Sequence, residues 1–576
     1  MAAGSVLSQD TKLKYEAPAS QAVGEAFKAG TAAVARGDLK TAHAEFAKVV
    51  RLAPKVAAGH SALGAVMLGE GQIAEAVAEL EQAHKLDPQD HAATTNLAVA
   101  YCRQNKWEKS ITLFKALQSS GVALQPAILA VYARALDGAA DAAGAEKILR
   151  QGLEAAPNSA ALHDNLGSVL AKQNKYADAE AEFGKAVELD GKTVSYQVHL
   201  GSLFLVEGKI NEAIQYLSNA VALAPNDSQA NLQLGKALQA AGQTEQAIEK
   251  LRRAHELDPE SVDATYHLGL SLQNHGDTAE SLSLLQHVVD QRPEDSDALI
   301  NLGLALVQSG KAKEALPIYQ KALKLSPNNA VVHQNLGVAY LQQSDLTGAI
   351  QQFRDGLAIS PDSPQLHYDL GLALKLQDRI PEAIPEFVKA AELDPSLPDP
   401  PYTLGVLYMQ TGKFEEAARE LQAALALRPD NGDAWSILGS VYKQLNEPEK
   451  AIEATRRAIQ LLPAQPSPHI TLAALLAQQG DTEGAKAERK IGADLSRVAV
   501  AHQRATFALE SGKALRQRGQ LAEALQQLQV AVAADPTNAA IHREMAMVLQ
   551  LQGKSAEAAV ERSKADELDP GAKGDH

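Results

Sequence analysis

The sequence predicts an all-α protein, a solenoid of about sixteen helix-turn-helix units stacked one on the next. Two observations carry this prediction. A small residue, usually glycine, recurs every 34 residues over most of the chain, followed at fixed offsets by a second small residue and a proline. Between these marks apolar residues follow the helical period, as Val332, Leu336 and Tyr340 do, so that they share one face of a helix. One such helix pair cannot bury its apolar stripes without copies on either side.

Residues 330–363 show the pattern of a single unit. The first helix is expected to end at a turn over residues 343–345, where Asp345 can accept hydrogen bonds from the free amides of the next helix. Pro361 ends the second helix, because proline cannot continue a helix that it follows. The second helix carries one apolar stripe, made of Leu346, Ala349, Ile350, Phe353 and Leu357.

The same marks recur in step with Gly337, which we use as the marker of its unit. Twelve residues after each marker stands a small residue, and twenty-four after it usually a proline. The pattern continues less strictly upstream to Gly30 and downstream to Ala546. In strict 34-residue register with Gly337 are Gly167, Gly201, Gly235, Gly269, Gly303, Gly371, Gly405 and Gly439.

The order of residue types is leucine-glycine, tyrosine or leucine, alanine, an aromatic residue or leucine, then proline, and this pattern resembles the tetratricopeptide (TPR) repeat family. The resemblance implies a right-handed α-solenoid of about sixteen TPR units. It also implies a superhelix whose concave side is lined by the first helix of each unit. Members of this family bind proteins or peptides, so the resemblance implies a protein or peptide partner.

The repeat boundaries predict four segments. Residues 1–22 lack a sustained period and are expected to form a flexible arm or cap. Residues 23–504 hold units 1–14, and residues 505–572 hold units 15–16 with a C-terminal cap, where a polar outer face is expected. Residues 573–576 form a tail.

The register loosens between units 14 and 15. The markers Ala473 and Gly512 lie 39 residues apart, so five residues are inserted. Proline is absent from about residue 483 to residue 517, which predicts one long helix, or two nearly continuous ones, across Lys486–Arg516, with fraying at Gly492. Arg489 stands where a bulky apolar residue is usual.

Composition excludes several classes of function. The net charge of −16, from 54 Lys and Arg against 70 Asp and Glu, argues against nucleic acid as the main partner. Cys102 is the only cysteine, which excludes an intramolecular disulfide and a thiolate-rich metal site. No apolar run reaches the length of a membrane span. The N-terminus lacks the apolar centre of a signal peptide, so a cytoplasmic location is expected, although a trimmed export signal would leave no trace. The oligomeric state is left open.

Histidine recurs four residues before the marker. One histidine per unit is too widely spaced for several to share one ion, because packed helices lie about 8–10 Å apart. We therefore predict packing with a polar tip, and no metal or other cofactor. The histidines are His60, His163, His333, His367, His469 and His542.

A polar stripe occupies the position two residues before the marker. It holds Asn96, Asn165, Asn301 and Asn335, with His199, Gln233, His267 and Asp369 in the same position of other units. The TPR region of O-linked N-acetylglucosamine transferase carries a similar asparagine ladder on its concave side, which holds the backbone of an extended peptide. The alternative is that these residues cap the packing between helices. The later units depart from the pattern, with Thr403, Ile437, Thr471, Glu510 and Glu544.

Units 8–12 carry the most specific feature, a pair of positions four residues apart on the first helix, three before and one after the marker. By the TPR resemblance this face is concave, and it would form an apolar, aromatic groove edged by glutamines. The alternative is that these side chains partly bury one another. The predicted partner-binding pairs are Tyr266 and Leu270, Ile300 and Leu304, Gln334 and Val338, Tyr368 and Leu372, and Tyr402 and Val406.

No catalytic motif accompanies the repeats. Gly553-Lys554-Ser555 resembles the end of a phosphate-binding loop, but Val548 stands where that loop needs glycine. The sequence therefore predicts a non-catalytic scaffold that binds an extended peptide or a partner helix in the groove. The alternative is a module that presents substrates to a separate enzyme such as a glycosyltransferase, for which the asparagine stripe would matter more. An enzyme would need a buried pair of perturbed ionisable groups in one cleft.

Overall fold

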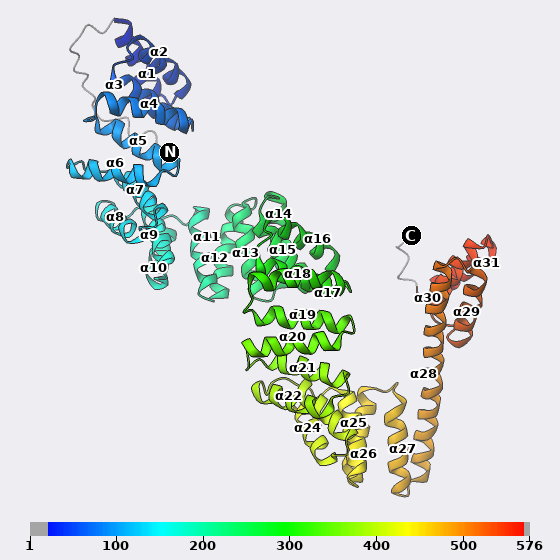
Figure 1. Cartoon of the computed structure of the whole chain (residues 1–576). Helices are drawn as coiled ribbons and strands as arrows, with labels where there is room; N and C mark the ends of the chain where they lie inside the picture. Colours follow the sequence, from blue (N-terminus) through cyan, green and yellow to red (C-terminus); the bar gives the residue numbers. More distant parts are fainter. Residues whose placement is uncertain (1–20, 570–576) are drawn as a thin grey trace. The chain divides into compact units, whose positions relative to one another are not determined.

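The computed structural model describes residues 21–569, and these form helices joined by turns, without a β-strand (Figure 1). The arm predicted for residues 1–22 falls almost wholly outside the described residues, and so does the predicted tail. The chain divides into two compact regions, an N-terminal region that ends at Ala305 and a C-terminal region that begins at Leu306.

The helices of the N-terminal region are α1 (Gln21–Ala35), α2 (Leu39–Leu52), α3 (Ala57–Gly69), α4 (Ile73–Leu86), α5 (His91–Arg103), α6 (Trp107–Ser119), α7 (Pro126–Gly138), α8 (Ala142–Ala155), α9 (Ala160–Lys172), α10 (Tyr176–Leu189), α11 (Val194–Val206), α12 (Ile210–Leu223), α13 (Ser228–Ala240), α14 (Thr244–Leu257), α15 (Val262–His275), α16 (Thr278–Gln291) and α17 (Ser296–Gln308), within which the region ends.

The helices of the C-terminal region are α18 (Ala312–Leu325), α19 (Ala330–Gln342), α20 (Leu346–Ile359), α21 (Pro364–Leu376), α22 (Ile380–Leu393), α23 (Asp399–Gln410), α24 (Phe414–Leu427), α25 (Gly432–Gln444), α26 (Pro448–Leu461), α27 (Pro466–Gln478), α28 (Thr482–Gln517), α29 (Leu521–Ala534), α30 (Ala539–Leu551) and α31 (Ser555–Leu568).

Helices pair as the sequence predicts. Apart from α17, within which the boundary between the regions falls, each odd-numbered first helix packs on the even-numbered second helix that follows it, up to α27 and α28, and each second helix packs on the next first helix. The last pairs are α28 with α29 and α30 with α31. Since α28 serves in two repeats, the 31 helices of residues 21–569 correspond to the predicted sixteen units.

The small marker residues bring the two helices of a repeat together. A Cβ atom added to Gly167 would lie 2.7 Å from the ring of Phe183, and one added to Gly371 would lie 2.8 Å from the ring of Phe387. Both rings are almost completely buried. The glycine of the first helix therefore makes room for the bulky residue sixteen positions later on the second helix.

The turn between the helices also follows the sequence prediction. In the unit of Gly337 the first helix ends at Gln342, and Ser344 adopts a left-handed backbone conformation with φ of 61°. The side chain of Asp345 then accepts a hydrogen bond from the backbone N–H of Gly348 at 2.9 Å, which caps α20.

The long helix predicted near the C-terminus is confirmed. α28 has 36 residues and runs without interruption from Thr482 to Gln517. The predicted fraying at Gly492 is wrong. Gly492 is buried in the middle of a continuous helix, where a Cβ atom would lie 2.9 Å from Cγ1 of Ile470 on α27. Close packing against α27 holds the backbone there despite the conformational freedom of glycine.

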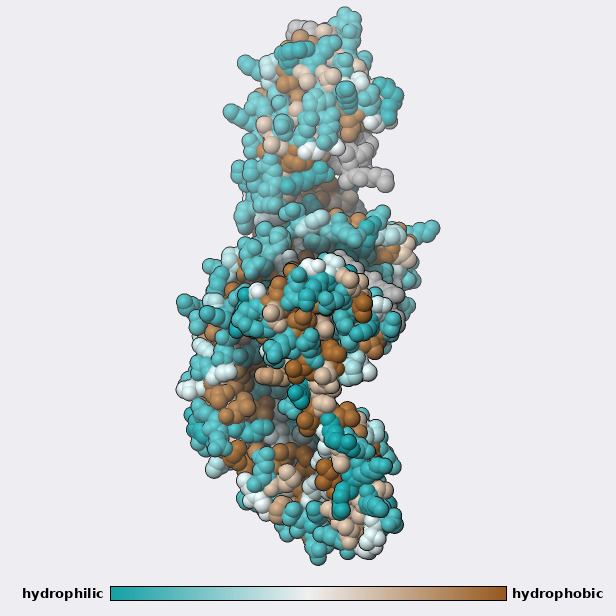
Figure 2. Space-filling view, turned by 90° about the vertical axis from the view of Figure 1, so that its right-hand side faces the viewer, coloured by the Kyte–Doolittle hydropathy of each residue, from teal (hydrophilic) through white to brown (hydrophobic). Residues whose placement is uncertain are grey.

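No helix among residues 21–569 is both long enough and apolar enough to cross a membrane. On the face shown in Figure 2, hydrophobic side chains gather in patches that hydrophilic side chains separate. Such patches on a solenoid are candidate contact surfaces for partners.

Candidate partner-binding surface

The C-terminal region holds six of the predicted groove residues on three successive first helices, α19, α21 and α23. All six side chains are half-buried. Tyr368 packs edge-on against the ring of Phe387, with ring centroids 5.5 Å apart. Val338, Tyr368 and Leu372 lie against the core formed around α20–α22, and Tyr402 lies against the next core cluster. Each of these four side chains thus presents one part to the core and another part to solvent.

The N-terminal region holds the other four predicted groove residues, on α15 and α17. Tyr266, Leu270 and Leu304 are half-buried, whereas Ile300 is buried, with 9 % of its surface exposed. Burial raises the pKa of the Tyr266 hydroxyl. In this part of the predicted surface Ile300, one of the four side chains, belongs to the core. This agrees in part with the alternative that these residues bury one another.

The polar stripe links neighbouring repeats. In three places a residue two before the marker is hydrogen-bonded to the residue three before the marker of the preceding repeat, 35 positions earlier. Asn301 donates through Nδ2 to the Tyr266 hydroxyl at 2.8 Å. The other two links join Asp164 to His199 at 2.7 Å and Gln334 to Asp369 at 2.7 Å.

These links favour the capping alternative for part of the stripe. The Asn301 amide is engaged by its own chain, and Asn96 is buried with 7 % of its surface exposed. Asn165 and Asn335 are half-buried. Asn96 and Asn301 therefore do not offer free amides to a peptide backbone. For Asn165 and Asn335 the asparagine ladder stays a prediction.

Two half-buried groups in the stripe have shifted pKa values. Burial lowers the pKa of His267 to about 4, and the nearby positive charge of Lys236 acts in the same direction. Burial raises the pKa of Asp369, although the hydrogen bond from Gln334 opposes that shift. Both shifts favour the uncharged form of the group concerned.

The recurring histidines form a second regular element. Nδ1 of His367 lies 2.6 Å from a carboxylate oxygen of Glu386 on the second helix, and its Nε2 lies 2.9 Å from the carbonyl oxygen of Pro361 in the preceding loop. Equivalent contacts join His60, His163 and His542 to a glutamate 19 residues later and a proline carbonyl six residues earlier. Both ring nitrogens of each histidine face acceptors, so each ring ties together two helices and a loop.

This element agrees with the predicted packing role of the histidines. The glutamate partner was not predicted, although glutamate recurs 19 residues after the histidine in the sequence. Trp435 takes the histidine position in its repeat and donates from Nε1 to the Pro429 carbonyl at 2.9 Å. Among residues 21–569 no three histidine, cysteine or acidic side chains gather as they would around a metal ion.

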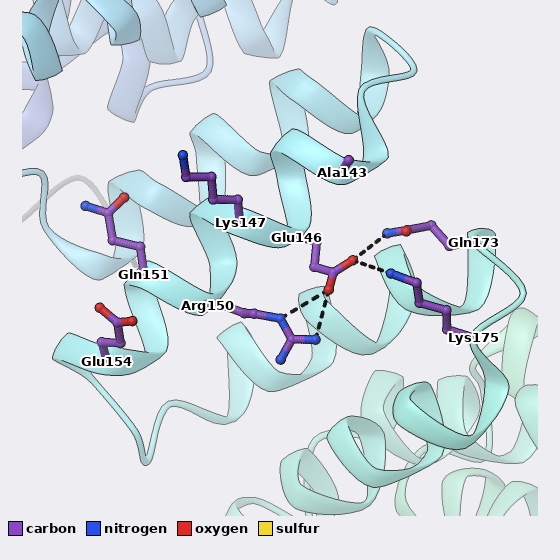
Figure 3. A pocket seen from close by; sticks show the side chains of 8 residues that line it. All are labelled: Ala143, Glu146, Lys147, Arg150, Gln151, Glu154, Gln173 and Lys175. Carbon is purple, nitrogen blue, oxygen red and sulfur yellow. Dashed lines mark hydrogen bonds and ion pairs between the residues drawn. The ribbon is translucent and has the colours of Figure 1, made fainter.

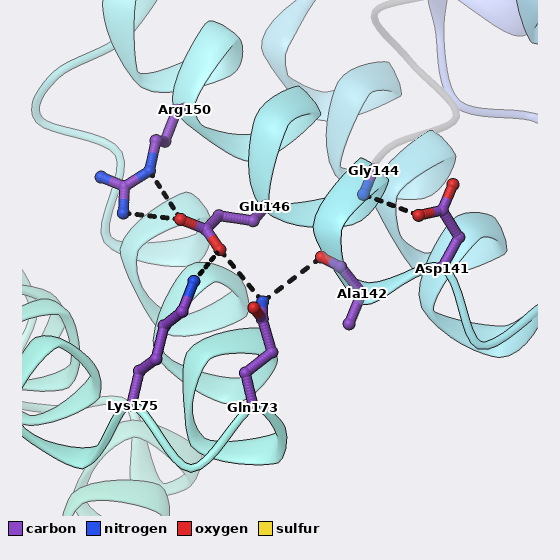
Figure 4. A network of polar contacts seen from close by, with 7 residues as sticks. All are labelled: Asp141, Ala142, Gly144, Glu146, Arg150, Gln173 and Lys175. Carbon is purple, nitrogen blue, oxygen red and sulfur yellow. Dashed lines mark hydrogen bonds and ion pairs between the residues drawn. The ribbon is translucent and has the colours of Figure 1, made fainter.

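A hollow of about 600 Å³ lies on the second helix α8 of the N-terminal region, beside the turn between α9 and α10 (Figure 3). At its centre Glu146 accepts hydrogen bonds from Arg150, Gln173 and Lys175 (Figure 4). Lys175 and then Arg150 hold the pKa of Glu146 down at about 2. The two cations therefore favour the ionised carboxylate, which joins two repeats.

A second hollow of about 430 Å³ lies between α24, α25 and α26 in the C-terminal region. Trp435 and Tyr442 line it, and Gln422 donates to the Tyr442 hydroxyl at 2.5 Å. This hollow was not predicted from the sequence. An aromatic residue in place of the recurring histidine is the signal that could have found it.

Comparison with protein families decides the identity of the repeats. Models described as tetratricopeptide repeat match residues 165–228, 266–330 and 402–466, residues 67–135, 204–267 and 306–373, and residues 466–488, and a model described as TPR repeat matches residues 512–553. The chain belongs to the TPR family. TPR proteins bind protein or peptide partners, and a chain built only of such repeats has the architecture typical of non-catalytic interaction scaffolds.

Three solved structures are reported as similar. The TPR protein YrrB, with an unusual peptide-binding site, is 26% identical over 32% of this chain and 95% of its own, with a TM-score of 0.29. The Cut9–Hcn1 hetero-tetramer of APC/C is 16% identical over 92% of this chain and 97% of its own, with a TM-score of 0.38. A TPR protein from Parabacteroides merdae is 18% identical over 43% and 98%, with a TM-score of 0.34. No curated protein matches the chain.

Proposed function

We propose that the C-terminal region of this TPR scaffold binds an extended, largely uncharged peptide, or the apolar face of a helix, along α19, α21 and α23. The observation that carries the proposal is the arrangement of three pairs, Gln334 with Val338, Tyr368 with Leu372, and Tyr402 with Val406. Each pair lies four residues apart on a first helix, and each side chain is half-buried. Side chains held partly by the core, with one face still open, form a pre-organised surface for a partner.

The size of this surface suits a short segment. Neighbouring packed helices lie about 8–10 Å apart, so two steps between three first helices cover roughly 20 Å. An extended chain advances about 3.3 Å per residue, so about six residues of peptide would cross the three pairs. The amide of Gln334 and the tyrosine hydroxyls can orient the peptide backbone, while Val338, Leu372 and Val406 contact apolar side chains.

The electrostatics of the surface favour an uncharged segment. Among residues 21–569, Asp369 is the only acidic side chain that hydrogen-bonds to one of the six residues, and its link to Gln334 is 2.7 Å long. Burial raises the pKa of this carboxyl group. A partner with a strong charge of either sign would find little to pair with among the six side chains.

The test is selection of 12-residue peptides from a phage-displayed random library on the immobilised full chain. The variant Val338→Glu with Leu372→Glu places two charges on the surface. The matched control, Ile359→Glu with Leu427→Glu, places two charges on the second helices α20 and α24. The two side chains that it replaces are each about two-fifths exposed.

We expect the wild type and the control to enrich the same apolar peptides and the surface variant to lose them, with unchanged helical circular dichroism for all three. Equal enrichment by all three proteins would move the site away from α19–α23. Lost helicity in the surface variant alone would show that its two positions are core rather than surface.

A further inference from the structure

Among residues 21–569, four repeats contain a complete histidine clamp, which we define as a ring whose two nitrogens both contact oxygen acceptors. In repeat 11, Nδ1 of His367 lies 2.6 Å from a carboxylate oxygen of Glu386 and Nε2 lies 2.9 Å from the carbonyl oxygen of Pro361. Glu386 lies on the second helix of the same repeat, whereas Pro361 lies in the loop that ends the preceding repeat. Each clamp therefore joins three elements across a boundary between repeats. The complete clamps are those of His60, His163, His367 and His542.

A complete clamp holds one proton more than a neutral ring beside an ionised carboxylate. A neutral imidazole has a single N–H donor, so its other nitrogen would face an acceptor with a lone pair. Both contacts are hydrogen bonds only when the ring carries two protons, or when the carboxyl group carries the second one. The two arrangements contain the same number of protons, so the clamp is complete only while the additional proton is bound.

In repeat 16 the second proton lies on the ring. Burial works against the ionisation of Glu561, but hydrogen bonds from Lys564 and then from His542 hold the pKa of this carboxyl group below its ordinary value. Glu561 is therefore an ionised acceptor, and His542 must donate from both nitrogens. His542 has 3 % of its surface exposed, so water has little access to replace a contact that is lost.

We propose that the complete clamps make the packing between repeats depend on pH. At mildly acidic pH the ring donates to both acceptors and holds the two helices of its repeat against the preceding loop. As the pH rises through the range in which histidine loses its charge, the proton leaves to solvent and one of the two hydrogen bonds is lost. The folded state binds this proton more tightly than the unfolded chain, so the stabilisation is present at lower pH and is lost as the pH rises. The clamps lie in repeats 2, 5, 11 and 16, so acidification tightens the solenoid at four boundaries.

Other repeats make part of this contact without the additional proton. In repeat 14, Nδ1 of His469 contacts Glu488, but Nε2 is buried without a hydrogen-bond partner among the described residues. In repeat 13, Trp435 donates to the Pro429 carbonyl at 2.9 Å through a group that does not titrate, and Ala454 stands in the position of the glutamate. Repeat 13 is therefore a neutral reference within the same chain.

The pH dependence of repeat 11 can be assigned to His367 and Glu386. Within residues 21–569, Glu386 is the only charged side chain in hydrogen-bond or ion-pair contact with the His367 ring. Asp362 in the preceding loop and Lys389 on α22 are exposed and make no such contact with the ring. Other charged groups on α20, α21 and α22 have partners of their own: Arg354 with Glu382, Asp355 with Gln351, and Asp369 with Gln334.

Hydrogen–deuterium exchange of the full chain at pH 6 and at pH 8, corrected for intrinsic exchange rates, measures the effect repeat by repeat. From pH 6 to pH 8 we expect the protection of α21 and α22 to fall by roughly threefold to tenfold relative to α25 and α26 of repeat 13, because one hydrogen bond is lost. An equal change in the two repeats would overturn the proposal.

The variant Glu386→Gln separates a pH-dependent clamp from a purely structural contact. A neutral His367 can donate to the Pro361 carbonyl and accept from the new amide, as the 3.0 Å contact of His333 with Gln352 in repeat 10 illustrates. We expect the relative fall in protection between pH 6 and pH 8 to disappear. Protection lowered by the same factor at both pH values would contradict the proposal, and so would an unchanged pH dependence.

A second variant repeats the test in the N-terminal region. Glu182→Gln changes the clamp of His163, whose Nδ1 lies 2.5 Å from the Glu182 carboxylate. We expect the pH dependence of protection to disappear in α9 and α10 and to remain in α21 and α22. Circular dichroism identifies a variant that does not fold, in which case the other variant decides the test. A pH dependence that persists in α9 and α10 of folded Glu182→Gln would overturn the proposal.

Discussion

Two residues in the C-terminal region, Leu366 and Phe507, occupy the same repeat position but differ in burial. Between α20 and α21 the chain turns, and Leu366 becomes buried beside Gly356. Within α28 the chain does not turn, and Phe507 remains 76 % exposed although it occupies the position of Leu366. The difference lies in the connection. Asp362 and Ser363 follow Pro361 in the first case, whereas the second has five extra residues and no proline.

The comparison shows what a repeat position does and does not determine. A side chain in this position is apolar in both places, so its local pattern predicts burial in both. Burial comes only when the following helix folds back, which a helix-breaking connection allows. An insertion that preserves helix propensity therefore converts a buried contact into an exposed surface.

The largest effect is expected in an ordinary repeat. In Gly337→Leu the new side chain would collide with the ring of Phe353, which has no exposed surface, and we expect a loss of roughly 3 kcal/mol in the free energy of unfolding. Thermal denaturation followed by circular dichroism measures it. The matched substitution in α28 is Gly492→Ala, where the nearest atom belongs to the half-exposed side chain of Ile470. We expect it to change the free energy of unfolding by no more than about 1 kcal/mol. An unchanged midpoint for Gly337→Leu would remove the basis of the stacking register.

A somewhat smaller effect should appear in the N-terminal region, where His267 should make the free energy of unfolding depend on pH. Burial lowers the pKa of His267 from 6.5 to about 4, so the unfolded chain binds a proton in a range where the folded chain does not. Stability should therefore fall as the pH drops from about 6.5 to about 4, by at most roughly 3 kcal/mol from this group. In His267→Gln the slope of stability between these pH values should be shallower, as urea denaturation at several pH values will show. If His267→Gln keeps the wild-type slope of stability against pH, the pH dependence does not come from His267.

The smallest effect concerns the polar stripe of the C-terminal region. Burial raises the pKa of Asp369, so the folded state disfavours its ionised form. Stability from this group is greatest at low pH and is lost as the pH rises from the ordinary value of 3.8 through the raised pKa. Asp369→Asn keeps an acceptor for Gln334 and removes the charge, so the variant should melt higher than the wild type at pH 7 and equally at pH 3. A lower melting point at pH 7 would show that the ionised carboxylate stabilises the fold.

Much of the fold could be predicted from the sequence because the repeat positions are set by local chemistry. The capping role of Asp345, the close approach at Gly371 and the absence of proline that leads to α28 each depend on residues within one helix pair. The fraying at Gly492 was mispredicted because glycine propensity was weighed without the neighbour Ile470, which becomes a neighbour only after folding.

The candidate site was less predictable because it depends on contacts between repeats. The sequence places Asn301 and Tyr266 in two separate stripes, and only the structure shows that one donates a hydrogen bond to the other. Ile300 fits the spacing of the groove yet is buried, because the depth of a side chain depends on the neighbouring helices as well as on its own face. The outward position of Phe507 likewise follows from a helix that is missing beside it.

One measurement addresses the comparison most directly. Leu366→Ala and Phe507→Ala are compared in the full chain by hydrogen–deuterium exchange, at a protein concentration at which sedimentation shows monomers. We predict that Leu366→Ala lowers the free energy of opening around α20–α22 by about 2–5 kcal/mol, as expected for a leucine truncated in a core. We predict that Phe507→Ala changes that of α28–α29 by less than about 0.5 kcal/mol, as expected for an exposed residue. A loss at Phe507 as large as that at Leu366 would contradict the account, because it would mean that the same chain already covers Phe507.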